Sequence, residues 1–165
     1  MERKLTLFLS SATLVLGVFV LVPSVSAADT GFLTFGANAA VTTSAGDNDG
    51  FEITPENATS SDNGYAVNTD SGTVASAACS LPNAESDQHD FYDFNFSVPA
   101  ASAVQGIEVT TEAFYSSGAG TNTLCVFLSW DNGTTWTAGK NTPDIGTTEV
   151  VNNLGGAAAG WGPTW

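Results

Sequence analysis

The chain has 165 residues, with 17 Asp and Glu but only three Lys and Arg, which gives a net charge of −14. A protein this poor in basic side chains cannot displace counterions from phosphates, so nucleic-acid binding is excluded. Recognition of carboxylates or phosphates by arginine is excluded for the same reason, and attraction to anionic membranes is not expected.

Residues 1–27 have the pattern of a cleavable signal peptide. A short basic region precedes an apolar run from Leu5 to Val22, and a small-x-small sequence ends at Ala27. We expect cleavage after Ala27, with Ala28 as the near alternative and an uncleaved membrane anchor as the competing interpretation. Cleavage predicts a protein that is secreted or lies on the extracellular cell surface, with no membrane attachment.

The next two regions differ in composition. Residues 28–50 are rich in Ala, Thr, Gly, Asn and Asp and are predicted to be a polar lead-in. Residues 51–165 alternate short β-type runs with turns that contain Gly, Pro or Asn, and no segment keeps a helical period over three turns. The predicted fold is therefore all-β, a jelly-roll-like or related antiparallel β-sandwich. The expected strands are Phe51 to Ile53, Tyr65 to Asn68, Thr73 to Cys79, Phe91 to Val98, Ile107 to Tyr115, Thr123 to Trp130, Thr135 to Ala138 and Glu149 to Leu154.

The chain contains two cysteines, Cys79 and Cys125. An even number of cysteines in an exported chain predicts a disulfide, and two buried free thiols are the alternative. Alternation along the 123–130 strand places Cys125 opposite the apolar positions Leu124 and Val126. We therefore expect the disulfide on the outer side or at an edge of a sheet.

The segment from Ser129 to Trp136 fits the pattern Ser-x-Asp-x-Gly-x-Thr-Trp at every fixed position. Asp131 is expected to accept backbone N–H bonds, Gly133 to allow a positive φ, and Trp136 to fold its indole under the hairpin. The pattern resembles the Asp-box of sialidase-type propellers and other extracellular β-proteins. One copy cannot close a propeller, and no arginine follows the signal peptide to hold a substrate carboxylate, so we interpret the motif as a structural hairpin.

Several different short motifs follow one another along about residues 47–165. Together they resemble an extracellular module of large secreted or surface proteins of bacteria and archaea. The resemblance implies a jelly-roll or related β-sandwich without enzymatic activity, and further strands beyond Trp165, so we expect the sandwich to be incomplete at its C-terminus. The motifs are Asp49-Gly50-Phe51-Glu52, Thr54-Pro55-Glu56-Asn57-Ala58, Asp70-Ser71-Gly72-Thr73, His89-Asp90-Phe91-Tyr92, Phe94 to Pro99, Gly106 to Val109, Leu154-Gly155-Gly156 and Trp161 to Trp165.

An acidic loop partly fits a calcium site. Asp47 and Asp49 precede a glycine, and Glu56 follows it six residues later. The first ligand position of an EF-hand would fall on Ala45 and no helices are predicted beside the loop, so an EF-hand is excluded. A looser calcium site formed by Asp47, Asp49 and Glu56 is predicted as the alternative to a plain polar turn, and no other cofactor is expected.

The remaining polar and aromatic residues bear on whether the protein holds a metal, binds sugars or has a structural role. His89 lies among carboxylates, but alternation puts His89 and Asp93 on one strand face and Asp90 on the other, so an acidic loop entering a strand is preferred to a metal site. The tryptophans and tyrosines suit either a core or a sugar-binding platform. We predict a structural or adhesive module that is not an enzyme. The sequence leaves its partner unknown, with a surface protein or a polysaccharide as the candidates. The alternative is a carbohydrate-binding module accessory to an extracellular glycoside hydrolase.

Overall fold

The computed structural model describes residues 29–43, 49–69, 79, 87–100, 102–116 and 121–162. The predicted signal peptide, most of the predicted 73–79 strand and Asp47 lie outside these residues. The described elements pair as three antiparallel two-stranded ribbons, β1–β2, β3–β6 and β4–β5. In chain order they are β1 (Ala37–Ala40), the 3-10 helix η1 (Pro55–Thr59), β2 (His89–Tyr92), β3 (Glu108–Ala113), β4 (Cys125–Val126), β5 (Lys140–Asn141) and β6 (Val150–Gly155).

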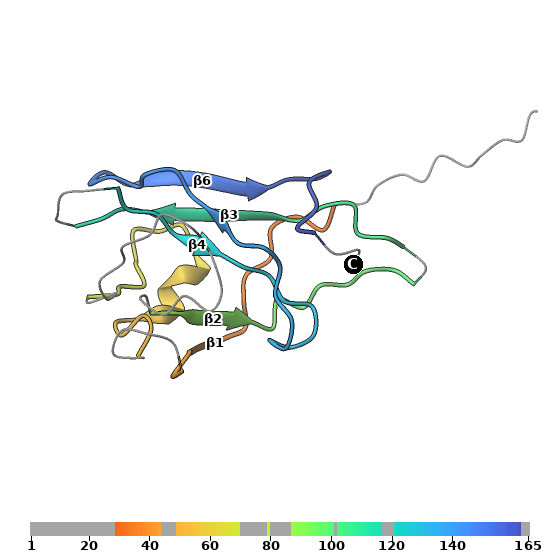
Figure 1. Cartoon of the computed structure of the whole chain (residues 1–165), viewed down its shortest axis with the longest axis horizontal. Coiled ribbons are helices and arrows are strands. Elements are labelled where there is room, and N and C mark those ends of the chain that lie inside the picture. Colours follow the sequence, from red (N-terminus) through yellow and green to blue (C-terminus); the bar gives the residue numbers. More distant parts are fainter. Residues whose placement is uncertain are drawn as a thin grey trace, which may run out of the picture.

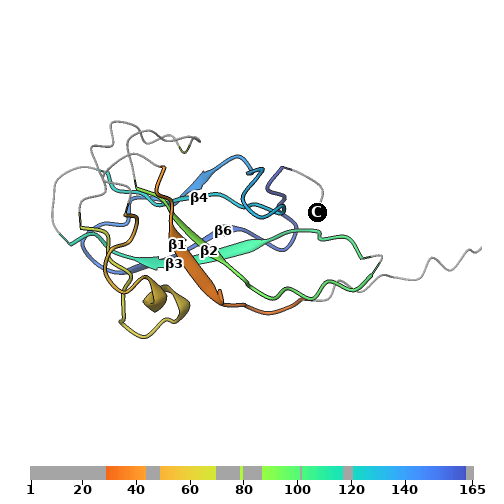
Figure 2. The same cartoon turned by 90° about the horizontal axis from the view of Figure 1, so that it is seen from below.

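The all-β prediction is confirmed, since the described part of the chain contains no α-helix. The described residues include no helix of the length and apolar character that a membrane crossing requires. In Figure 1 the β3–β6 ribbon lies on one side of the molecule and the β1–β2 ribbon on the other, with β4 between them. Figure 2 shows the same layers from below, with β2 crossing the direction of β3. The described strands are not joined into the two larger sheets of a complete sandwich.

The β3–β6 ribbon forms where the sequence alternates most regularly. Val109 and Thr111 are half-buried while Glu108 and Thr110 are exposed, and Val109 lies opposite the buried Leu154 of β6. At its first residues one strand face therefore meets the protein interior and the other meets water.

A small core lies beside this ribbon. Trp161 is only 2 % exposed, and its indole Nε1 donates a hydrogen bond to the carbonyl oxygen of Ile107 at 2.9 Å. The Nζ atom of Lys140 lies 5.1 Å from the centroid of the Trp161 ring, close enough for a cation–π contact. Ile145 and Leu154 are the other buried apolar side chains among the described residues. The core is thus confined to one side of the molecule.

Two buried threonines shorten the β4–β5 ribbon. The hydroxyl of Thr137 accepts the N–H of Leu128 at 3.0 Å, and the hydroxyl of Thr142 accepts the N–H of Leu124 at 3.0 Å. Each threonine also donates its own N–H to the carbonyl of the same residue. A side-chain oxygen thus replaces a backbone carbonyl at both ends of the ribbon, so the expected 123–130 strand is only Cys125–Val126.

The β1–β2 ribbon differs from the prediction in two places. β1 (Ala37–Ala40) lies within the region predicted as a polar lead-in, where no strand was expected. β2 begins at His89 and ends at Tyr92, whereas the expected strand continued to Val98. It ends there because Asp93 has a φ of 61° and Asn95 a φ of 53°, in the left-handed region that no strand uses. Asp93 therefore does not continue the alternation that was expected to pair it with His89.

Candidate functional site

The Ser129–Trp136 hairpin is held by a compact set of hydrogen bonds. Asp131 Oδ1 accepts the backbone N–H of Thr135 at 2.7 Å and the hydroxyl of Ser129 at 3.0 Å. The Ser129 hydroxyl also accepts the N–H of Gly133 at 2.8 Å. The indole Nε1 of Trp136 donates to the carbonyl of Gly133 at 3.0 Å, which places the ring under the turn. The structure thus brings the four predicted hairpin residues into one turn.

Backbone conformation and charge both suit this turn. Asn132 has a φ of 59° and Gly133 a φ of 80°, values that an Asn-Gly pair adopts at low cost. Hydrogen bonds from Thr135 lower the pKa of Asp131 because they stabilise its ionised form. The hydrogen bonds of the Ser129, Asp131 and Trp136 side chains all have partners within the turn, so they serve the local structure.

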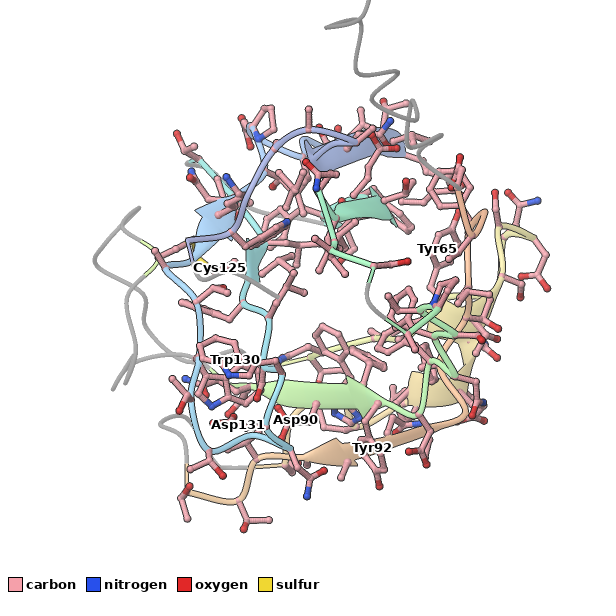
Figure 3. All side chains as sticks on the ribbon, turned by 90° about the vertical axis from the view of Figure 1, so that its right-hand side faces the viewer. Tyr65, Asp90, Tyr92, Cys125, Trp130 and Asp131 are labelled. Carbon is pink, nitrogen blue, oxygen red and sulfur yellow. A yellow bond between two sulfur atoms is a disulfide. The ribbon has the colours of Figure 1, made fainter. Side chains whose placement is uncertain are left out.

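The predicted disulfide is confirmed. Cys79 and Cys125 are joined, with their Cα atoms 5.4 Å apart. Cys125 is exposed, while Leu124 and Val126 on either side of it are half-buried. The bond therefore lies on the outer face of β4, as the alternation predicted, and Figure 3 shows Cys125 on this strand.

His89 begins an aromatic cluster on one face of β2. Its Nδ1 accepts the backbone N–H of Phe51 at 3.1 Å and its Nε2 lies 2.8 Å from Asn38 Oδ1, so the neutral ring with a proton on Nε2 satisfies both partners. The ring stacks on Phe51 at 5.6 Å and packs against Phe91 at 5.0 Å. Burial lowers the pKa of His89, partly opposed by Asp90. Burial raises the pKa of Asp90, partly opposed by His89.

This arrangement gives His89 a structural role. A proton on Nδ1 would face the N–H of Phe51, so charging the ring would break that hydrogen bond. The chain turns tightly enough to reach the ring only because Gly50 has no side chain. A Cβ on Gly50 would lie 2.6 Å from His89 Nδ1.

The predicted calcium residues are only partly described. Asp49 is exposed and Glu56 lies in the first turn of η1, while Asp47 lies outside the described residues. Among the residues that are described, no group of three or more His, Cys, Asp or Glu side chains is placed to hold a metal ion. The calcium site therefore stays a prediction.

An open cavity of about 3880 Å³ lies between the ribbons, and Figure 3 looks into it. Ten large hydrophobic side chains of the described residues are exposed, and all of them except Ile53 and Val151 line this cavity. Most of the exposed large apolar side chains therefore border one open space, which more than half of the described residues line. Sequence reasoning missed this cavity because no local pattern reports the distance between ribbons. The eight that line it are Phe32, Leu33, Val67, Tyr92, Phe96, Val98, Phe114 and Trp130.

Trp130 and Tyr92 are two of the aromatic side chains at this cavity. Trp130 is 45 % exposed in the hairpin and Tyr92 is 43 % exposed at the end of β2. In Figure 3 both are labelled in the lower half of the view, as are Asp90 and Asp131. Trp161, in contrast, belongs to the core, so only part of the predicted aromatic platform faces the cavity.

Comparison of the chain with protein-family models, with curated proteins and with solved structures finds no significant match.

Proposed function

We propose that the chain is a non-catalytic structural or adhesive module of a secreted or cell-surface protein. The observation that carries the proposal is the open cavity, into which eight of the ten exposed large hydrophobic side chains are gathered. Clustered exposed apolar surface is typical of interaction sites in soluble proteins. The Cys79–Cys125 disulfide supports an extracellular setting, because such bonds form and persist in oxidising compartments.

Location and adhesion are tested separately. The full chain is expressed in a bacterium, the cell is fractionated, and the protein is analysed by mass spectrometry with and without reductant. We expect an exported protein that is shortened by its signal peptide and carries the disulfide. A full-length protein that stays in the cytoplasm with two free thiols would overturn the extracellular part of the proposal.

Adhesion is measured with beads that carry the purified, oxidised protein. The beads are passed under flow over surfaces coated with extracellular proteins or with insoluble polysaccharides. Retention that is lost with Phe114→Ala, which changes the cavity wall, but kept with Val151→Ala, an exposed position outside it, supports the proposal. Retention on no surface, or turnover of a glycoside substrate by the protein, contradicts it.

The second candidate is a carbohydrate-binding module, favoured by the exposure of Trp130 and Tyr92 at one cavity. Aromatic faces of this kind suit stacking against sugar rings. A glycan array distinguishes the two candidates. Sugar binding that is lost with Trp130→Ala and kept with Val151→Ala would favour the carbohydrate-binding module over a protein-binding one.

A further inference from the structure

The three ribbons are oriented in the same way around the cavity. Every residue of β2, β3 and β4 lines it, whereas no residue of their partners β1, β6 and β5 does. Each ribbon therefore has an inner strand at the cavity and an outer strand away from it. Figure 3 shows this arrangement, with β2 and β3 between the open centre and their partners.

The inner strands have free edges toward the cavity. Within the described part of the chain, β2, β3 and β4 each pair with one strand only. In a strand with one partner, every second residue directs its N–H and C=O groups away from that partner. These unpaired backbone groups are the template to which an added strand binds. β3 offers the longest such template, six residues from Glu108 to Ala113.

The size of the cavity indicates which kind of molecule it accepts. Pockets for small molecules measure roughly 300–1,000 Å³, and this cavity has about 3880 Å³. A small ligand would leave most of the apolar lining in contact with water. An extended polypeptide segment, in contrast, can contact the lining and pair with a free edge at the same time.

The charge of the lining indicates the composition of that segment. The described lining residues include no Lys or Arg. Lys140, the basic residue of the described chain, lies instead over Trp161. A second copy of this chain, with a net charge of −14, would bring further negative charge to an acidic lining. The carboxylates at the cavity are Asp29, Asp62, Asp87, Asp90, Asp93, Glu108 and Glu112.

We propose that the cavity takes up an extended segment of a partner protein, in which basic and apolar residues alternate, as an added strand on β3. The alternation follows from β3 itself, where Glu108, Thr110 and Glu112 share one face and Val109 and Ala113 share the other. Neighbouring strands place like faces together, so basic residues of the segment lie beside the glutamates and apolar residues beside Val109. This inference rests on the proposed function and names the kind of partner.

The test uses a fluorescent ten-residue peptide in which Lys alternates with Val and Thr, added to the oxidised protein at 0.15 M salt. We expect saturable one-to-one binding by fluorescence anisotropy and slower amide hydrogen exchange in β3. A peptide of the same composition with its lysines in one block, and an alternating peptide with N-methylated backbone, are expected to bind at least about tenfold more weakly. Equal affinity for all three peptides, or no binding, would overturn the proposal.

Protein variants locate the site. The double variant Glu108→Gln/Glu112→Gln is expected to weaken binding about tenfold. The matched variant Asp144→Asn/Glu149→Gln removes the same charge from positions outside the lining and is expected to leave most of the affinity. Equal losses in both variants would show general charge attraction and would refute a site on β3. Adhesion of the beads without peptide binding would refute this inference alone and leave the proposed function standing.

Discussion

Removing the Cys79–Cys125 disulfide is expected to destabilise the fold strongly. The bond joins residues separated by 46 positions, and the loop that it closes contains β2 and β3, one inner strand from each of the two opposing ribbons. In the chain-entropy model, whose mechanism is disputed, closing a loop of this length contributes about 4 kcal/mol to the free energy of unfolding. For a domain of this size that corresponds to a fall in Tm of roughly 10–15 °C.

The assay is thermal unfolding followed by far-UV circular dichroism, with Cys79→Ala/Cys125→Ala compared with the parent protein. Reductant provides the control, since it should lower the Tm of the parent to that of the variant and leave the variant unchanged. A variant whose Tm lies within about 3 °C of the parent would refute the reasoning. It would mean that the ribbons are held in place without the covalent link between their loops.

Three further predictions concern single residues. Gly50→Ala is expected to cost about 1–3 kcal/mol more than Gly146→Ala in urea unfolding, because both glycines have positive φ but only Gly50 faces a clash; equal costs would contradict this. His89 has a pKa lowered by burial, so its stability contribution is present above pH 6.5, the value of the unfolded chain, and falls as the pH drops below it. Urea midpoints at pH 7.5 and 5.5 should therefore differ more for the parent than for His89→Gln, and an equal difference would show that His89 is not responsible. Asp131→Ala should lower the Tm more than Asp131→Asn, because an amide oxygen can still accept the N–H of Thr135; equal losses would show that the charge, which both variants remove, matters and the acceptor does not.

Local patterns in the sequence predicted the elements that local physics decides. β3 was found because Glu108, Thr110 and Glu112 fall on one face and Val109 and Ala113 on the other, and β6 because β-branched valines open a short run bounded by glycines. The turn at Asn132 and Gly133 was found because positive φ depends on the residue itself. The disulfide was predicted from the even number of cysteines together with the predicted signal peptide. None of these features needs information from a distant part of the molecule.

The errors occur where a distant partner decides the structure. The sequence Ala-Asn-Ala-Ala of β1 has no alternation, and it is a strand because it pairs with β2 beneath a cluster of phenylalanine rings. β4 is shortened by the hydroxyls of Thr137 and Thr142, which lie on the facing segment of its own hairpin. The cavity depends on how far apart three ribbons lie. Sequence periodicity reports which face of a strand is apolar, and it does not report what that face packs against.

The acidic lining of the cavity opposes association between two copies of the protein through the unpaired edges of the inner strands. Unpaired strand edges are sites of self-association unless charges oppose it, and β3 carries Glu108 and Glu112 beside such an edge. Two copies would bring these carboxylates together, whereas a basic segment would neutralise them. Salt should weaken this repulsion, since the Debye length falls from about 30 Å at 0.01 M to about 3 Å at 1 M.

We therefore expect sedimentation to show a monomer at low salt and increasing self-association at 1 M salt. In Glu108→Gln/Glu112→Gln the association should already begin at low salt. Self-association that decreases with salt would show that attraction between charges, and not exposed edges, brings the copies together.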